Sequence, residues 1–428
     1  MGRTAIIGGG MAGIACARSL EAAGMDWALF ECSDRLGGRV RTDLVDGFRL
    51  DRGFQVYLTA YRNVGEAIDE PALRLRAFVP GAMVFDGRGF GRISHPLRHP
   101  VAAARAVLSR PSQALDLARL APMALAAMRS TADEPGPSEG TTEDLLRRMD
   151  LGIGTVDGFL RSFFGGVFLD RSLRTDASQF RFTFANFARG DAAVPALGMG
   201  ELPLQLAASL PASRIHLGTR VGAVARRGGR MRVRTADGTD HEFAAVVLAT
   251  DMASAHALDE RVPDRAWQST ATMHWACAAD RVPNAMREPI LFLDGTGDGP
   301  VNHAACMTAA APEYAPHGQA LVSLNLVDPR WQSESATVLV SRVVAQMERW
   351  FGAGAMRGWH LLRTDRVVRA LPRQHPADLA RRPAPELDDG LVVAGDHVTD
   401  ASIDGAYRSG LRAAETVRSM LTRGSTPA

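Results

Sequence analysis

The stretch Thr4-Ala5-Ile6-Ile7-Gly8-Gly9-Gly10-Met11-Ala12-Gly13 decides the expected fold, because it leads from a short apolar strand into a glycine-rich turn. An alanine-rich helical pattern follows over Ala12–Ala23 and ends at Gly24. A second apolar strand is expected over Trp27–Phe30. This order of strand, turn, helix and strand predicts the first unit of a Rossmann-type α/β domain.

The glycines of the turn fit the pattern G-x-G-x-x-G, and each has its own role. Gly8 permits the tight turn, Gly10 lets the backbone approach a pyrophosphate, and Gly13 lets the helix pack closely on the strand. The N–H groups at the start of the helix, around Ala12, face the phosphates. Glu31 follows the second strand, where its carboxylate would accept hydrogen bonds from ribose hydroxyls. Together these features predict a dinucleotide-binding site.

A second glycine pair follows in Arg35-Leu36-Gly37-Gly38-Arg39-Val40-Arg41-Thr42. Paired glycines expose backbone N–H groups, and arginine side chains can fork onto phosphate oxygens. A surface hairpin with solvated arginines is the alternative interpretation. The position of the segment beside a nucleotide site favours phosphate binding.

With these two motifs the sequence resembles the FAD-dependent superfamily of amine oxidases, phytoene desaturases and protoporphyrinogen oxidases. The resemblance continues in Phe48–Phe54, Pro195–Leu210, Ile215–Val224 and Leu391–Ala406, and it is closest to the desaturase-like branch. It implies an α/β fold in which a discontinuous Rossmann-type FAD-binding domain carries an inserted α+β substrate domain. The expected FAD-binding domain comprises residues 1–62, 195–260 and 375–428, and the expected substrate-binding domain comprises residues 63–194 and 261–374.

The resemblance also implies which residues hold FAD. These are Gly8, Gly10, Ala12, Gly13, Glu31, Cys32, Gly38, Arg39, Gly53, Phe54, Val221, Gly395, Asp396, Ile403 and Ala406. Asp396 would accept hydrogen bonds from ribityl hydroxyls, and a helix beginning near Ser402 would direct its partial positive charge at the flavin. Gly405 would let the backbone approach the ring. FAD is expected to be non-covalent, because no cysteine follows Cys306.

Two features depart from the amine oxidases. Those enzymes carry a lysine that bridges to the flavin through water, whereas all 49 basic residues of this chain are arginine. They also place an aromatic residue before the last helix, where this chain has Ser402. Both departures favour the desaturase and porphyrinogen-oxidase branches, without excluding amine substrates.

Candidates for substrate contact and catalysis are Gln55 and Tyr57, which follow the strand beside the flavin, and His274 on a strand expected at Ala271–Ala279. The aromatic segment Phe163–Phe168 would suit a flat or apolar ligand. Ordinary core packing is the alternative for each of them. His303 and His360 are interpreted as core or surface histidines, and no metal site is expected.

Composition excludes several other classes of protein. The 428 residues carry a formal net charge of +2, which does not favour nucleic acid as a partner. No apolar run approaches the roughly 20 residues of a membrane span. The four cysteines form no CxxC pair and indicate a reducing cytoplasm. The helical stretch Pro100–Met128 could touch a membrane surface, but a core-facing hairpin broken at Pro111 is preferred.

The expected function is removal of hydride from a C–H or C–N bond of a small, apolar or aromatic organic substrate. Oxygen, a quinone or a nicotinamide would accept the electrons. A flavin amine or amino-acid oxidase is the alternative within the superfamily. A redox-neutral flavin-dependent isomerase is the alternative of another class, and a non-catalytic flavin-binding protein is a third.

Overall fold

The computed structural model describes residues 2–94, 111–332, 334–388 and 390–423. Its first sheet has the strand order β10-β2-β1-β14-β21-β20, and neighbouring strands are parallel except β20 and β21. The strands are β1 (Thr4–Ile7), β2 (Trp27–Phe30), β10 (Ile215–His216), β14 (Ala245–Leu248), β20 (Glu386–Asp388) and β21 (Leu391–Val393). This sheet confirms the α/β fold that the first thirty residues indicate.

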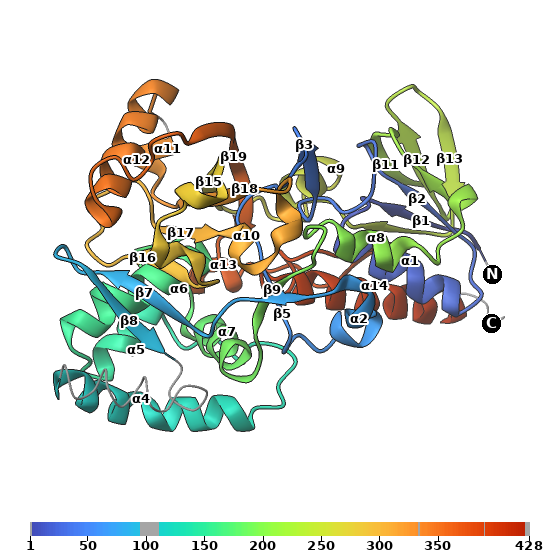
Figure 1. Ribbon diagram of the computed structural model, residues 1–428. Helices are drawn as coiled ribbons and strands as arrows, with labels where there is room; N and C mark the ends of the chain where they lie inside the picture. Colours follow the sequence, from blue (N-terminus) through green and yellow to red (C-terminus); the bar gives the residue numbers. More distant parts are fainter. Residues whose placement is uncertain (1, 95–110, 333, 389, 424–428) are drawn as a thin grey trace.

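Both faces of this sheet are covered, which explains why its strands are almost entirely apolar. On one face Ile6 and Leu29 pack against helices α1 (Met11–Ala22) and α14 (Ile403–Arg423). On the other face the alternate residues Ile7 and Phe30 pack against a three-stranded sheet. That sheet consists of β11 (Val221–Arg227), β12 (Arg230–Thr235) and β13 (Asp240–Phe243), and α9 (Met252–Leu258) lies beside it. Figure 1 shows α1 and α14, from opposite ends of the chain, side by side.

A second sheet has the order β19-β15-β18-β17-β16-β7-β8. Its strands are β7 (Gly81–Phe85), β8 (Phe90–Ser94), β15 (Trp267–Ala278), β16 (Leu291–Asp294), β17 (His303–Cys306), β18 (Gln319–Leu326) and β19 (His360–Pro372). Helix α12 (Ala336–Phe351) packs on one face through Leu339 and Val343. The four residues of β17 carry no alternation strong enough to identify a strand from the sequence.

A helical layer lies on the side of the second sheet that is opposite to α12 (Figure 1). It contains α4 (Pro111–Arg129), α5 (Thr142–Arg148), the π-helix η2 (Gly154–Leu160), α6 (Arg161–Phe168) and α7 (Ala177–Arg189). The expected hairpin at Pro100–Met128 lies partly outside the described residues, and α4 begins at Pro111 as a single helix. Leu115, Leu125 and Met128 are exposed on α4, so this helix is not wholly core-facing. Among the described residues, no helix is long and apolar enough to cross a membrane.

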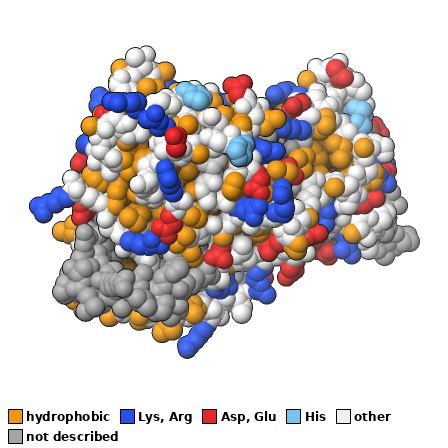
Figure 2. Space-filling view, in the orientation of Figure 1, with side chains coloured by type: hydrophobic (Ala, Val, Ile, Leu, Met, Phe, Trp, Pro, Cys, Tyr) orange, Lys and Arg blue, Asp and Glu red, His pale blue; other side chains and the backbone are white. Residues whose placement is uncertain are grey.

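The remaining elements are short. The strands are β3 (Thr42–Val45), β4 (Phe48–Asp51), β5 (Tyr57–Leu58), β6 (Arg76–Ala77) and β9 (Ala192–Val194). The helices are η1 (Gly65–Ala67), α2 (Glu70–Leu73), α8 (Glu201–Ala207), η3 (Ala212–Arg214), η4 (Ala279–Arg281), η5 (Asn284–Arg287), α10 (Met307–Ala310), η6 (Pro312–Tyr314), α11 (Pro329–Gln332) and α13 (Pro376–Leu379). Arginine and acidic side chains are interspersed on the face shown in Figure 2, as the near-neutral net charge predicts.

Candidate functional site

A cavity of about 1720 Å³ runs from the first sheet to the helical layer. Its wall includes the turn after β1, the segment that follows β2, the start of α14 and side chains of α4, α6 and α7. A typical small-molecule pocket has roughly 300–1,000 Å³. This cavity is therefore large enough for a dinucleotide and a second molecule.

The turn after β1 forms the cradle at one end of the cavity. Gly8 has φ +107°, and a Cβ there would lie 2.5 Å from the carbonyl oxygen of Ala249. A Cβ at Gly13 would lie 1.9 Å from the carbonyl oxygen of Gly8, so α1 packs directly on the turn. A Cβ at Gly10 would meet nothing within 4 Å, although Gly10 lines the cavity. The first and third glycines are thus required by protein packing, whereas the second leaves space for a ligand.

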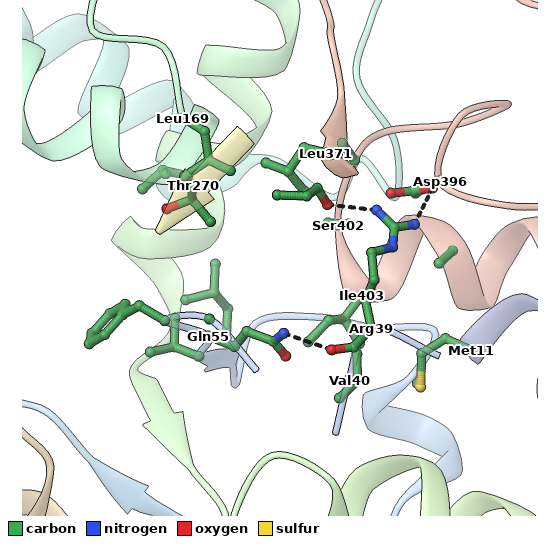
Figure 3. A pocket seen from close by; sticks show the side chains of 18 of the residues that line it. Met11, Arg39, Val40, Gln55, Leu169, Thr270, Leu371, Asp396, Ser402 and Ile403 are labelled. Atoms are coloured by element: carbon green, nitrogen blue, oxygen red, sulfur yellow. Dashed lines mark hydrogen bonds and ion pairs between the residues drawn. The ribbon is translucent and has the colours of Figure 1, made fainter. Parts of the chain in front are cut away.

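The second glycine pair lies against this cradle. The Gly37 N–H donates to the Gly9 carbonyl oxygen at 2.8 Å, and a Cβ at Gly38 would lie 3.2 Å from the Cα of Gly10. The Arg39 guanidinium donates to the Asp396 carboxylate at 2.7 Å, as Figure 3 shows, and to the Ala370 carbonyl oxygen. Arg39 therefore joins the N-terminal segment to the carboxyl end of β21 beside the cradle.

Glu31 is 7% exposed and uses both carboxylate oxygens to organise the nucleotide end. Oε2 accepts the Gly9 N–H at 2.7 Å, and Oε1 accepts the Ser33 N–H at 2.8 Å. Glu31 lines the cavity together with Cys32 and Val221. The carboxylate is thus oriented by the turn that forms the cradle, and its remaining lone pairs are available to a ribose.

We expect Glu31→Ala to weaken FAD binding ten- to a hundredfold while leaving the protein folded. The substitution removes a charge-assisted hydrogen-bond acceptor worth about 1.5–3 kcal/mol and also releases the Gly9 N–H. Titration of apoprotein with FAD measures the change. Glu242→Ala, at an exposed position of β13, is the control. Equal FAD affinity in both variants would place the Glu31 carboxylate outside the ribose site.

The start of α14 forms another part of the wall. Ser402 Oγ accepts the Gly405 N–H at 2.8 Å and donates to Asp400, so Ser402 caps the helix. Ile403 and Ala406 line the cavity. The expectation for Gly405 differs from the structure, because a Cβ there would lie 2.3 Å from the Asp400 carbonyl oxygen. Gly405 is needed for packing of the preceding loop, and it does not form the cavity wall.

These residues fit a flavin dinucleotide. The open sides of Gly10 and Gly53 form a backbone surface that a side chain would fill, and Gly53 has φ +91°. Of the fifteen residues expected to hold FAD, fourteen line the same cavity. The exception is Gly13, which lies behind the cradle.

Aromatic and aliphatic side chains form the other end of the cavity. Phe159 and Phe163 contribute from η2 and α6, and Phe184 and Phe187 contribute from α7. The Phe163 ring contacts those of Phe159 and Phe187, with the centroids of Phe163 and Phe187 5.0 Å apart. Leu120 and other residues of α4 complete this apolar chamber, which is suited to an apolar or aromatic molecule.

The three catalytic candidates have different positions. Gln55 lines the cavity, and its Nε2 donates to the Arg39 carbonyl oxygen at 2.9 Å (Figure 3) and to the Arg52 carbonyl oxygen at 2.9 Å. Tyr57 points away from the cavity and donates to Glu70, whereas Leu58, its successor in β5, lines the cavity, because successive residues of a strand face opposite sides.

His274 lies behind the 53–55 segment, outside the main cavity. Its Nδ1 is 3.0 Å from Ser323 Oγ, and its Nε2 is 3.3 Å from Asp365 Oδ2. Asp365 itself lines the cavity, so His274 can act on a bound ligand only through that carboxylate.

Several polar residues of the wall are not among the residues that the sequence predicts for the site. Tyr61, Thr270, His303 and Asn325 line the cavity, whereas the sequence predicts only a core or surface position for His303. His303 packs edge to face on Phe54, with ring centroids 4.7 Å apart. No local motif marks these positions, because they become neighbours only through pairing of distant strands. His360, in contrast, is exposed.

His397, buried behind the turn at Gly395, predicts a dependence of stability on pH. Burial lowers its pKa from the ordinary 6.5 to about 4. Below pH 6.5 the unfolded chain binds a proton that the folded protein excludes, so stability is full above 6.5 and is lost as the pH falls toward 4. We expect a loss of about 2 kcal/mol at pH 5 from this group.

Urea unfolding of the parent and of His397→Leu at pH 7 and pH 5 measures this contribution. The variant should lose less stability than the parent between the two pH values. His360→Leu, at an exposed position, is the control. Parallel losses in the parent and His397→Leu would contradict the assignment.

The fold and the cavity define a protein of the Rossmann α/β class whose glycine-rich turn and apolar chamber border one cavity. Residues 11–418 match the sequence model of a protein family, the flavin-containing amine oxidoreductases. The chain belongs to this family and is a flavin-dependent oxidoreductase. The superfamily resemblance of the sequence is thereby confirmed.

Individual relatives agree with this assignment over different lengths. The chain is 32% identical over 78 residues to protoporphyrinogen oxidase 2, chloroplastic/mitochondrial, of Arabidopsis thaliana; the match spans 18% of this chain but only 15% of that protein. An oxidoreductase from Methanosarcina mazei has a similar structure, with a TM-score of 0.74, 17% identity and coverage of 96% of this chain and 100% of that one. Wild-type putrescine oxidase bound to putrescine also has a similar structure, with a TM-score of 0.72 and 16% identity. The match covers 98% of this chain and 99% of that one. At these identities the two structures show a shared fold.

Proposed function

We propose that this protein binds FAD non-covalently and removes hydride from a C–H or C–N bond of a small, apolar or aromatic substrate. One observation carries the proposal: the glycine cradle and the aromatic chamber are two ends of the same cavity. A molecule in the chamber therefore lies in the same cavity as the ligand of the cradle. Bound FAD would supply the hydride acceptor.

The proposed roles of the protein residues follow from their positions. Gly10 and the start of α1 would hold the pyrophosphate, and Glu31 would bind the ribose. Asp396, fixed by Arg39, would accept hydrogen bonds from the ribityl chain. The N-terminus of α14 would place partial positive charge near the flavin ring, which stabilises its reduced, anionic form. The apolar chamber would orient the substrate and exclude water.

A flavin amine or amino-acid oxidase is the second candidate, and membership of the amine oxidoreductase family favours it. Two features of the chain instead favour a substrate that donates hydride from a C–H bond and is not an amine. The sequence contains no lysine, and Ser402 is committed to capping α14. Both contrast with the amine oxidases that the sequence resembles.

Anaerobic flavin bleaching with a panel of substrates tests the proposed reaction. The panel should pair cyclic alkenes and polyenes with primary amines, polyamines and amino acids of similar size. We expect bleaching by apolar C–H donors, followed by reoxidation with oxygen, a quinone or a nicotinamide. Faster bleaching by the amines would select the second candidate. Turnover without consumption of any acceptor would select a redox-neutral isomerase.

The division into two domains is also proposed, with the boundaries given by the sequence. The first sheet draws its strands from residues 1–62, 195–260 and 375–428, and the second sheet draws its strands from 63–194 and 261–374, which supports the division. We further propose a cytoplasmic location, because all four cysteines are free thiols.

A further inference from the structure

The second sheet presents polar side chains to the apolar chamber. On β15, β17 and β18, residues such as Met273 and Leu324 face α12, whereas Thr270, His303 and Asn325 face the cavity. Asn325 lies directly opposite His303 in the register of β17 and β18. Thr270, His303 and Asn325 are 6%, 4% and 2% exposed. Polar atoms buried in this way require hydrogen-bond partners.

The amide oxygen of Asn325 faces two threonines. Its Oδ1 accepts from Thr272 Oγ1 at 2.8 Å, and at 2.9 Å it shares the proton of Thr270 Oγ1 with the Leu326 carbonyl oxygen. The other branch of the amide, Nδ2, carries two protons. No side chain or backbone oxygen in the described part of the chain accepts from it. Asn325 therefore presents an unused donor on the cavity wall.

The tautomer of His303 is fixed by a chain of donors. Arg171 can only donate, and it donates to Asn302 Oδ1. Asn302 Nδ2 consequently faces His303 and donates to its Nδ1 at 3.1 Å. The ring proton lies on Nε2, which has no acceptor among the described residues. Burial lowers the pKa of His303 to about 3, so the ring is a neutral donor at physiological pH.

These donors belong to the chamber end of the cavity. A Cβ at Gly166 of α6 would lie 2.9 Å from His303 Nδ1, so α6, which supplies Phe163, packs directly on this histidine. In Figure 3 Thr270 lies beside Leu169, across the cavity from Asp396 and Ser402. Asn325 and His303 therefore line the cavity on the side of α6, across from the residues assigned to the ribityl chain.

We propose that Asn325 and His303 form a recognition site for an oxygen acceptor of the substrate, a carbonyl or a carboxylate. The proposal rests on the proposed function, which places the substrate in this chamber. It narrows the substrate class to apolar molecules that carry such an oxygen. An apolar molecule without an acceptor would leave both donors buried and unpaired, which disfavours its binding.

Four probes with the same ring test this site: 2-acetylnaphthalene, 2-naphthoate, 2-ethylnaphthalene and 2-naphthylmethylamine. Their dissociation constants for the FAD-loaded protein are measured from the change in flavin absorbance. We expect the ketone or the carboxylate to bind about tenfold more tightly than the hydrocarbon. The comparison of ketone and carboxylate shows which oxygen the site prefers.

Asn325→Asp replaces the donor by an acceptor of the same size. We expect this variant to lose the preference for the oxygen probes and to favour the amine, while its FAD content stays unchanged. His303→Phe should reduce the preference, and His303→Gln should restore part of it through the amide N–H. Asn284→Asp, at an exposed position outside the cavity, should behave as the parent.

Three outcomes would overturn the proposal: no preference for either oxygen probe in the parent, a preference that persists in Asn325→Asp, or loss of FAD from that variant. The third would make Asn325 a cofactor ligand. If the protein prefers the oxygen probes but no substrate bleaches its flavin, the proposed reaction is rejected and the recognition site is retained. If hydrocarbons bleach the flavin and the oxygen probes bind no more tightly than the hydrocarbon probe, the proposed reaction is retained and the recognition site is rejected.

Discussion

Gly10→Val is expected to lower FAD affinity on the order of a hundredfold or more without unfolding the protein. Gly10 has φ −77°, which any residue adopts, and a Cβ there would meet no protein atom within 4 Å. The valine would instead occupy the space through which a pyrophosphate approaches the backbone. The effect should therefore fall on the cofactor and spare the fold.

Titration of apoprotein with FAD measures the affinity, and urea unfolding of the apoprotein measures the stability. Gly89→Val is a matched control, because Gly89 also has free space around it but lies on the exposed β7–β8 turn. We expect Gly89→Val to bind FAD as the parent does. Normal FAD binding by Gly10→Val would show that the dinucleotide does not pass over this turn.

Gly410→Val is expected to destabilise the protein by about 3 kcal/mol or more. Gly410 lies in α14 where that helix crosses α1, and a Cβ there would lie 2.0 Å from the Ala12 carbonyl oxygen and 2.8 Å from Ala15 Cβ. Both contacts are shorter than van der Waals separation, and the neighbours are backbone and a methyl group that cannot rotate away. The valine must separate the two helices, which is a severe form of overpacking.

The free energy of unfolding in urea gives the size of this effect. Arg418→Val, at an exposed position of the same helix, controls for the lower helix propensity of valine and should cost less than about 1 kcal/mol. FAD affinity should fall in Gly410→Val as well, because α1 begins at the cradle and α14 begins at the cavity wall. A stability equal to that of Arg418→Val would show that the helices separate without cost.

The agreement between sequence and structure is closest where the signal is local. Strands β1 and β2 begin and end as expected, and Ser402 begins the last helix as its cap. Other elements are divided. The segment Ile215–Val224, which carries part of the family resemblance, forms β10 and the start of β11, and Gly218 adopts φ +64° in the loop between them.

The sequence by itself determined the class of fold and the nucleotide end of the cavity. A glycine-rich turn between a strand and a helix depends on backbone conformations that a few adjacent residues impose, so G-x-G-x-x-G and Glu31 predict the cradle without knowledge of the remaining chain. The two packing glycines and the open Gly10 are therefore already distinguished by their order in the motif.

Only the tertiary structure decided the substrate end. Successive residues of a strand face opposite sides, so in β5 Leu58 reaches the cavity and Tyr57 does not. His303 and Asn325, distant in sequence, become neighbours because β17 pairs with β18. Their donors remain unused because Asn302 and the threonines of β15 fix their orientation. Strand register and side-chain direction arise from long-range packing, and no local pattern of residues specifies them.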